Sequence, residues 1–131
     1  MSIRLLPVPL ILLASGYAAY AADSGDAATG KSFFAQTCQQ CHTADPQEGG
    51  GEIGPSLVGL MGRTAGTGDP RFAYTAALKE SKLVWSRETL ERFLADPGAA
   101  VPGTTMPIPV PQRKDRDDLI VYFQSLASAA K

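Results

Sequence analysis

The clearest pattern in this chain is a group of apolar residues near its C-terminus that recur with the period of a helix. They are spaced i, i+3, i+4 and i+7: Leu119, Tyr122, Phe123 and Leu126. Acidic residues precede them in a predicted first turn, where negative charge suits the helix dipole: Asp115, Asp117 and Asp118. The pattern therefore predicts a helix that closes the fold.

A second apolar stripe lies between a good N-cap residue and a helix-breaking triplet. Ser86 is the N-cap candidate, Glu88 lies in the first turn, and Asp96-Pro97-Gly98 ends the pattern. The apolar positions between them are Leu90, Phe93 and Leu94. This pattern predicts a helix from about Arg87 to Ala95.

The first half of the chain predicts one further helix and two short ones. In "KSFFAQTCQQCH", the positions of Phe34, Cys38 and Cys41 are i, i+4 and i+7, so the two cysteines are expected on one helix face. The segments Pro55–Gly62 and Thr75–Glu80 have patterns that suit short helices. No segment alternates apolar and polar residues for long enough to predict a strand, so the expected fold class is all-α.

Long loops connect these predicted helices. They are "TADPQEGGGEIGPS", "RTAGTGDPRFA" and "DPGAAVPGTTMPIPVPQ". The last is expected to be extended coil, because proline and glycine do not sustain a helix interior. Loops of this length are unusual in a small domain unless something else holds them, and a large buried cofactor would do so.

The N-terminal segment has the three-part layout of a secretory signal. A single positive charge at Arg4 is followed by an apolar run and by the small-residue pattern Ala19-Tyr20-Ala21. We predict that residues 1–21 are a cleaved signal peptide, that 22–29 form a flexible lead-in, and that 30–131 form the folded domain. An uncleaved membrane anchor is the alternative, since the apolar run is about the minimum length for a spanning helix.

Composition allows one modest globular domain, with 131 residues of which 44% are hydrophobic and 19% are charged. Loss of residues 1–21 removes Arg4 and no acidic residue, which leaves a formal charge of about −2. The domain has no basic footprint for nucleic acid. A membrane partner is expected only if the signal is not cleaved.

The stretch "TCQQCHTAD" holds both cysteines and the only histidine of the chain. Its Cys-x-x-Cys-His spacing, at Cys38, Cys41 and His42, indicates covalent attachment of a c-type haem. Two thiols on one face can add to the two haem vinyl groups, and the adjacent imidazole can bind the iron. A secretory signal agrees with this chemistry, because proteins with this motif acquire haem outside the bacterial cytoplasm. The expected location is the bacterial periplasm.

Three other chemistries compete for the same residues. A disulfide between Cys38 and Cys41 would close only a small loop and would leave His42 unexplained. A thioredoxin-like redox pair is expected at a helix start in a fold that contains strands. A structural zinc site needs four ligands, and two cysteines with one histidine do not supply them.

The second axial position of the iron has several candidates in the sequence, namely Met106, Met61 and the lysines. Met61 lies in the apolar segment "SLVGLMGR" and is most simply a core residue. Met106 lies in a proline-stiffened loop far along the chain from His42, so it could approach the opposite haem face. Met106 is therefore the favoured second ligand.

Six segments resemble class I c-type cytochromes, in the order and nearly the spacing of that family. They are "GKSFFAQTCQQCHT", "GPSLVGLMGRTAG", "FAYTAALKES", "VWSRETLERFLADP", "VPGTTMP" and "DLIVYFQSL". From Gly30 to about Leu126 the chain is similar to mitochondrial cytochrome c and its soluble bacterial relatives. The resemblance implies a small fold of helices and long loops around one covalent haem and its iron.

The resemblance also implies roles for particular residues. Met106 is similar to the distal ligand of the family, and Pro55 to the residue whose carbonyl accepts the ring proton of the haem-binding histidine. Three residues correspond to family positions that hydrogen-bond or neutralise the haem propionates: Arg63, Tyr74 and Trp85. Thr104 corresponds to a hydroxyl of the loop that carries the methionine. The crossing of the first and last helices in the family corresponds to Gly30, Phe34 and Tyr122.

The chain differs from the family at three positions near the expected haem. Leu78 stands where relatives often have Asn, and Phe93 where they often have Tyr, so the polar network beside Met106 is reduced. Thr105 replaces a lysine that is common at the exposed haem edge. The first two differences affect the redox potential and the strength of Met106 ligation, and the third affects partner identity.

The expected function is one-electron transfer rather than catalysis, without a small-molecule substrate. A His/Met pair leaves the iron with no vacant site, and thioether ligation favours the reduced metal. The expected partners are membrane-bound or soluble oxidases, reductases or dehydrogenases, which contact the protein transiently. A haem peroxidase or gas-binding sensor with a labile distal methionine is the alternative, because Leu78 and Phe93 reduce the polar support near Met106.

Overall fold

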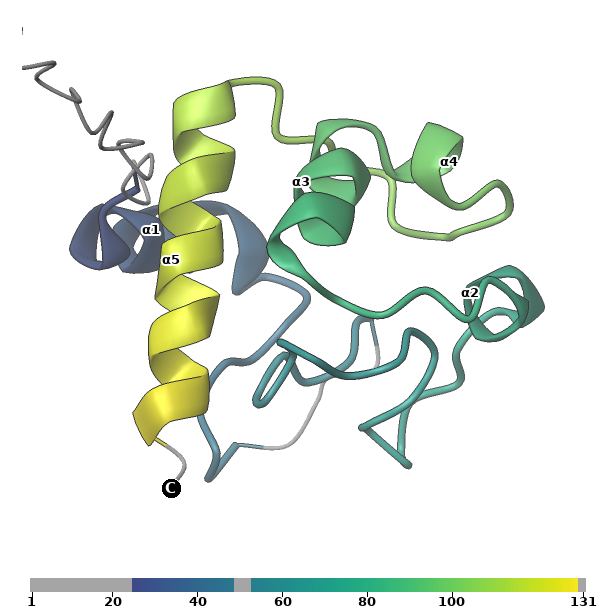
Figure 1. The fold of residues 1–131 in the computed structure, drawn as a ribbon. Coiled ribbons are helices and arrows are strands. Elements are labelled where there is room, and N and C mark those ends of the chain that lie inside the picture. The colour runs from purple at the N-terminus through teal and green to yellow at the C-terminus, as the bar shows by residue number, and fades with distance from the viewer. Residues whose placement is uncertain (1–24, 49–52, 130–131) are drawn as a thin grey trace, which may run out of the picture.

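The computed structural model describes residues 25–48 and 53–129, in which five α-helices and one π-helical turn are joined by loops (Figure 1). The helices are α1 (Ala27–Phe33), α2 (Ala76–Glu80), α3 (Arg87–Ala95), α4 (Pro97–Ala100) and α5 (Arg113–Ala129), and the π-helix η1 (Phe34–Cys38) continues α1. The predicted signal peptide, residues 1–21, lies outside the described residues. Within the described ranges, no helix has the length and apolar character needed to cross a membrane.

The first and last helices cross and form one side of the molecule (Figure 1). Gly30 allows the close approach, because a Cβ atom at this position would meet the backbone carbonyl of Asp118. Next to it, the Phe34 ring packs on the rings of Tyr122 and Phe123, with centroids 5.8 and 5.9 Å apart. The η1 continuation of α1 and the helix α5 therefore pack apolar side chains into the same core.

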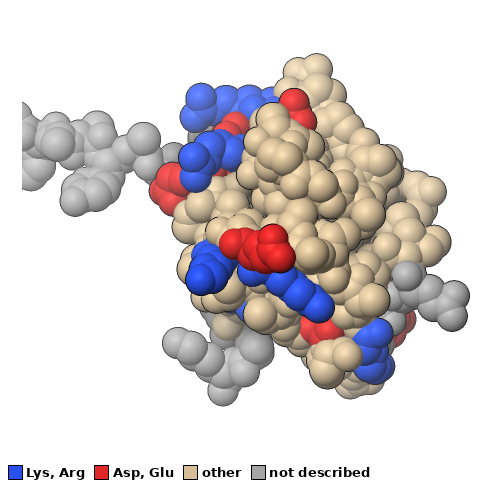
Figure 2. All heavy atoms as spheres, turned by 90° about the vertical axis from the view of Figure 1, so that its right-hand side faces the viewer, with Lys and Arg blue, Asp and Glu red and all other residues tan. Residues whose placement is uncertain are grey.

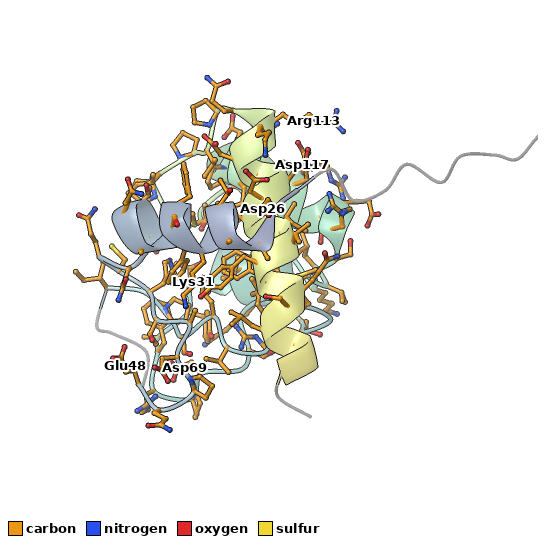
Figure 3. The ribbon with its side chains drawn as sticks, turned by 90° about the vertical axis from the view of Figure 1, so that its left-hand side faces the viewer. Asp26, Lys31, Glu48, Asp69, Arg113 and Asp117 are labelled. Carbon is orange, nitrogen blue, oxygen red and sulfur yellow. The ribbon has the colours of Figure 1, made fainter. Side chains whose placement is uncertain are left out.

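Polar contacts fix the start of α1 against α5. The Asp26 side chain accepts a hydrogen bond from the Thr29 N–H and caps α1. The Asp26 N–H donates to Oδ1 of the fully buried Asp118, at 2.7 Å, and Lys114 donates to the same carboxylate. Figure 3 shows Asp26 beside α5 at this crossing. The cap starts the helix at Ala27, so residues 27–29, which the composition had placed in a lead-in, are helical.

Four of the five expected helices are present, and α3 has the expected bounds. The helix expected in "KSFFAQTCQQCH" is formed by α1 and η1 and ends at Cys38. Its Ser86 cap accepts from the Thr89 N–H, and Thr89 Oγ1 accepts in turn from the Ser86 N–H. The short helix expected at 75–80 is α2, and the C-terminal helix is α5. Strands are absent from the described residues, which contain only an isolated bridge between Thr64 and Val84. The all-α fold class is confirmed.

Two expectations about local structure were wrong. The segment 55–62 is not a helix but a series of turns, because Gly59 and Gly62 adopt φ values of 64° and 80° that end any right-handed helix. The proline-rich segment 96–112 is not entirely coil, since α4 forms one turn at its start. Asp96 caps that turn by accepting from the Ala99 N–H, and Pro97 occupies a first-turn position where its missing N–H costs nothing.

Candidate functional site

All nine residues that the sequence analysis selected line a single apolar cavity between the helices and the loops. They are Cys38, Cys41, His42, Pro55, Arg63, Tyr74, Trp85, Thr104 and Met106. The remaining lining is mainly apolar and includes core residues of α3 and α5: Leu90, Phe93, Leu94, Leu119 and Phe123. Met61 packs against the core instead and is not among the lining residues.

The two cysteines reach the cavity through a widened helix end rather than from one regular helix face. The π-helix η1 ends at Cys38, and the chain then turns, with the N–H groups of Cys41 and His42 donating to the Cys38 carbonyl. Both thiols are free and half-buried. Burial, with a smaller effect of Cys41, raises the pKa of the Cys38 thiol to about 11. Both cysteines line the cavity, and the Cys38 thiol is held in its protonated form.

The His42 imidazole has a fixed orientation. Its Nδ1 lies 2.8 Å from the carbonyl oxygen of Pro55, which can only accept, so Nδ1 carries the proton. Burial lowers the pKa of His42 below its ordinary value, and the hydrogen bond to Pro55 opposes that effect only in part. The ring is therefore neutral and leaves the Nε2 lone pair available to a metal.

Arg63 and Trp85 reach the cavity from two segments that pair through their backbones. The Trp85 N–H donates to the Arg63 carbonyl at 3.0 Å, and the Gly62 N–H donates to the Trp85 carbonyl at 2.8 Å. Nη1 and Nη2 of Arg63 donate to the carbonyls of Val58 and Ser56. Its Nε is buried without a partner, which is the condition expected of a donor that belongs to an anionic group of a ligand.

Tyr74 and Met106 lie in two loops that line the same cavity. The Tyr74 hydroxyl donates to the Thr67 carbonyl at 2.9 Å and accepts from the Asp69 N–H at 3.2 Å, so it is engaged by its own loop. Met106 is half-buried, and its N–H donates to Thr104 Oγ1 at 3.4 Å. The Thr104 hydroxyl therefore accepts a hydrogen bond from the backbone of Met106.

Sequence reasoning missed a buried carboxylate that connects two loops of the site. Asp69, 4% exposed, accepts from the Ser56 N–H and the Arg71 N–H, both at 3.1 Å. Ser56 follows Pro55, so Asp69 helps to fix the loop that orients His42. Figure 3 shows Asp69 among the loops below α1. A single Asp in a Gly/Pro-rich loop indicates a turn, and no sequence signal distinguished it from other turn residues.

The cavity fits a haem. Two thiols and an imidazole nitrogen lie at one wall, the interior is apolar, a thioether lines it from a distant loop, and an arginine N–H lacks a partner. Fold and site together define a small all-α haem protein of the c type.

Comparisons with known proteins agree with this class. Residues 27–127 match the family model described as Cytochrome c. Cytochrome c of Euglena viridis is 43% identical over 103 residues, which cover 78% of this chain and 98% of the relative. Cytochrome cH from Methylobacterium extorquens is a similar solved structure, with a TM-score of 0.70 and 42% identity over 77% of this chain and 99% of its own. The chain belongs to the cytochrome c family.

Membership of the family fixes the cofactor and the general activity. Proteins of this family carry one covalently bound haem c with its iron, and Cys38 and Cys41 occupy the attachment motif. Cytochromes c are electron carriers that act with redox partners and are not enzymes. This chain is therefore a haem-based electron carrier.

Proposed function

We propose that this protein is a one-electron carrier of the bacterial periplasm in which His42 and Met106 are the two axial ligands of the haem iron. The observation that carries the proposal is the convergence of all nine expected residues on one apolar cavity, with His42 fixed by Pro55 and with Met106 in the same lining. The iron, when bound, supplies a one-electron couple whose potential the thioether raises.

The protein's own residues attach, orient and enclose the cofactor. Cys38 and Cys41 retain the ring, and the Pro55 carbonyl holds the His42 imidazole at a constant angle. Arg63 neutralises acidic groups of the haem through its unpartnered Nε, and Trp85 closes the apolar wall. Because both axial ligands come from loops anchored in a packed core, little rearrangement accompanies electron transfer.

The charge distribution favours transient partners that rely little on electrostatic steering. A broad area of the face that carries α2 and α4 has no Lys, Arg, Asp or Glu among the described residues (Figure 2). The formal net charge of the whole chain is −1. We infer contacts with redox proteins that are small, short-lived and only weakly dependent on salt.

The optical spectrum of the oxidised protein tests the axial ligands. A methionine-to-iron charge-transfer band is expected, lost in Met106→Ala and kept in Met61→Ala, because Met61 is outside the cavity lining. The opposite pattern would assign the ligand to Met61. Rapid, stoichiometric carbon monoxide binding by the reduced protein would favour the alternative, a peroxidase or gas sensor, for which Leu78 and Phe93 supply an apolar distal wall.

The location is tested at the N-terminus of the purified protein. Cleavage after residue 21 or 22 is expected from the signal layout. Mass spectrometry of protein expressed with its own leader would measure this directly, and a mature chain that begins at Met1 or Ser2 would contradict the cleaved signal.

A further inference from the structure

An almost buried arginine connects α5, α3 and the loop that carries Met106. Arg116 in α5 is 9% exposed, and its Nε and Nη2 donate to Glu91 Oε1 of α3 at 3.0 and 2.8 Å. Its Nη1 donates to the carbonyls of Val110 and Pro111, both at 2.8 Å. One guanidinium thus makes four hydrogen bonds to two separate elements.

The loop needs a donor from outside because several of its residues have no N–H group. Proline has no amide hydrogen, and three prolines follow Met106 within five residues: Pro107, Pro109 and Pro111. The segment from Pro107 to Pro109 is exposed. The loop is anchored after this segment by the buried Val110, whose N–H donates to the Leu94 carbonyl at 2.7 Å and whose carbonyl accepts from Arg116.

Glu91 keeps the guanidinium in that position. Arginine stays protonated, so an almost buried guanidinium needs a counterion, and the Glu91 side chain is only 31% exposed. The two N–H···O bonds to one carboxylate oxygen set the plane of the guanidinium and direct Nη1 at the loop carbonyls. Removal of the carboxylate would leave Arg116 free to turn toward solvent.

We propose that Glu91 and Arg116 are a positioning pair that holds the end of the Met106 loop and thereby sets how readily the thioether leaves the haem iron. The inference rests on the proposed Met106 ligation. The pair does not touch the cofactor. It acts through Val110 and Pro111, which lie four and five residues after Met106.

The test is the rate at which imidazole replaces the thioether in the oxidised protein. At saturating imidazole, this rate reports departure of Met106. Arg116→Lys keeps the positive charge but loses the planar guanidinium and with it several of the four hydrogen bonds. The replacement rate should rise about tenfold, the effect expected when hydrogen bonds to a charged group are lost. Arg113→Lys, on the same helix with an 82% exposed side chain, is the matched control and should leave the rate unchanged.

A second variant and a second measurement separate positioning from general stability. Glu91→Gln keeps the side-chain shape and removes the charge, and it should raise the same rate less than Arg116→Lys, with a non-additive effect in the double variant. Hydrogen exchange of the Val110 amide should become faster in both variants. A purely structural role would lower the thermal midpoint and leave the saturating rate unchanged.

The possible results distinguish this inference from the ligation on which it rests. An unchanged saturating rate in Arg116→Lys and Glu91→Gln, together with loss of the charge-transfer band in Met106→Ala, would overturn the positioning pair and leave the ligation standing. Retention of the band in Met106→Ala would overturn the ligation itself. Should Arg116→Lys fail to assemble, Glu91→Gln alone decides the question by the same rate.

Discussion

His42 and Pro55 are thirteen residues apart in the chain, and the imidazole Nδ1 lies 2.8 Å from the proline carbonyl oxygen. Gly54, directly before Pro55, makes this approach possible, since a Cβ atom there would lie 2.7 Å from Cε1 and 2.8 Å from Nδ1 of His42. The ring orientation thus depends on a missing side chain in the loop before Pro55.

Gly54→Ala is therefore expected to displace the His42 ring and lengthen its hydrogen bond to Pro55. Overpacking of this kind costs about 2 kcal/mol of unfolding free energy. A weaker hydrogen bond at Nδ1 makes the imidazole a poorer electron donor, so the midpoint potential should rise. Urea unfolding and redox titration measure the two effects.

Gly98→Ala is the control for this substitution. The nearest atom to a Cβ at Gly98 is Asp96 Oδ1 at 3.6 Å, an ordinary contact, and the residue lies in α4. Its stability should stay the same or increase slightly, because alanine favours helix. Equal effects of the two alanine substitutions would contradict the role assigned to Gly54.

Covalent retention of the haem is expected to survive loss of either cysteine and to fail only when both are lost. Cys38 and Cys41 lie at one cavity wall, and each thiol can hold one side of the ring. After denaturing electrophoresis, Cys38→Ala and Cys41→Ala should each keep haem staining, and the double variant should lose it. Haem that separates from the unsubstituted chain on unfolding would rule out covalent attachment.

Local patterns were sufficient for the helices with a long periodic stripe and clear ends. The Ser86 cap and the apolar residues of α3 gave its bounds, and α5 followed from its period. The turns at 55–62 were not predicted, because the spacing of apolar residues does not indicate the positive φ values of Gly59 and Gly62. The one-turn helix α4 was missed because proline and glycine at its start indicate coil in most contexts.

The residues of the site also fall into those that local sequence could predict and those that it could not. Cys38, Cys41 and His42 are adjacent in sequence, so their chemistry was visible without a structure. Pro55 and the residues expected to contact the haem propionates could be selected only by resemblance to a family, and their contacts with haem stay a prediction. Asp69 and the Glu91–Arg116 pair have partners up to 25 residues away, and neither residue type nor spacing indicates which distant groups a side chain will meet.

The close crossing of α1 and α5 predicts a large penalty for any side chain at Gly30. A Cβ atom there would collide with the backbone carbonyl of Asp118, which cannot move without shifting α5. Gly30→Ala should lower the unfolding free energy by about 3 kcal/mol, at the upper end of overpacking effects. Ser32→Ala, on the exposed side of α1, should change it by less than about 0.5 kcal/mol. Urea unfolding would measure both, and similar values would contradict the close contact.

Asp69 predicts a pH-dependent contribution to stability. The Ser56 N–H, with smaller contributions from Arg71, holds the pKa of the Asp69 carboxyl below its ordinary value of 3.8, although burial opposes the shift. Because the pKa is lower in the folded than in the unfolded chain, the stabilisation is present above pH 3.8 and is lost as pH falls through the folded-state pKa.

Asp69→Asn should therefore be less stable than the unsubstituted protein at pH 5 to 7, and the difference should shrink once the carboxyl is protonated in both states. Urea unfolding at a series of pH values measures this. Arg71→Gln is the control, and it should keep most of the pH dependence, because the Ser56 N–H is the largest cause of the shift. A difference between Asp69→Asn and the unsubstituted protein that stays constant as the pH falls below 3.8 and through the folded-state pKa would show that Asp69 acts through packing and not through its charge.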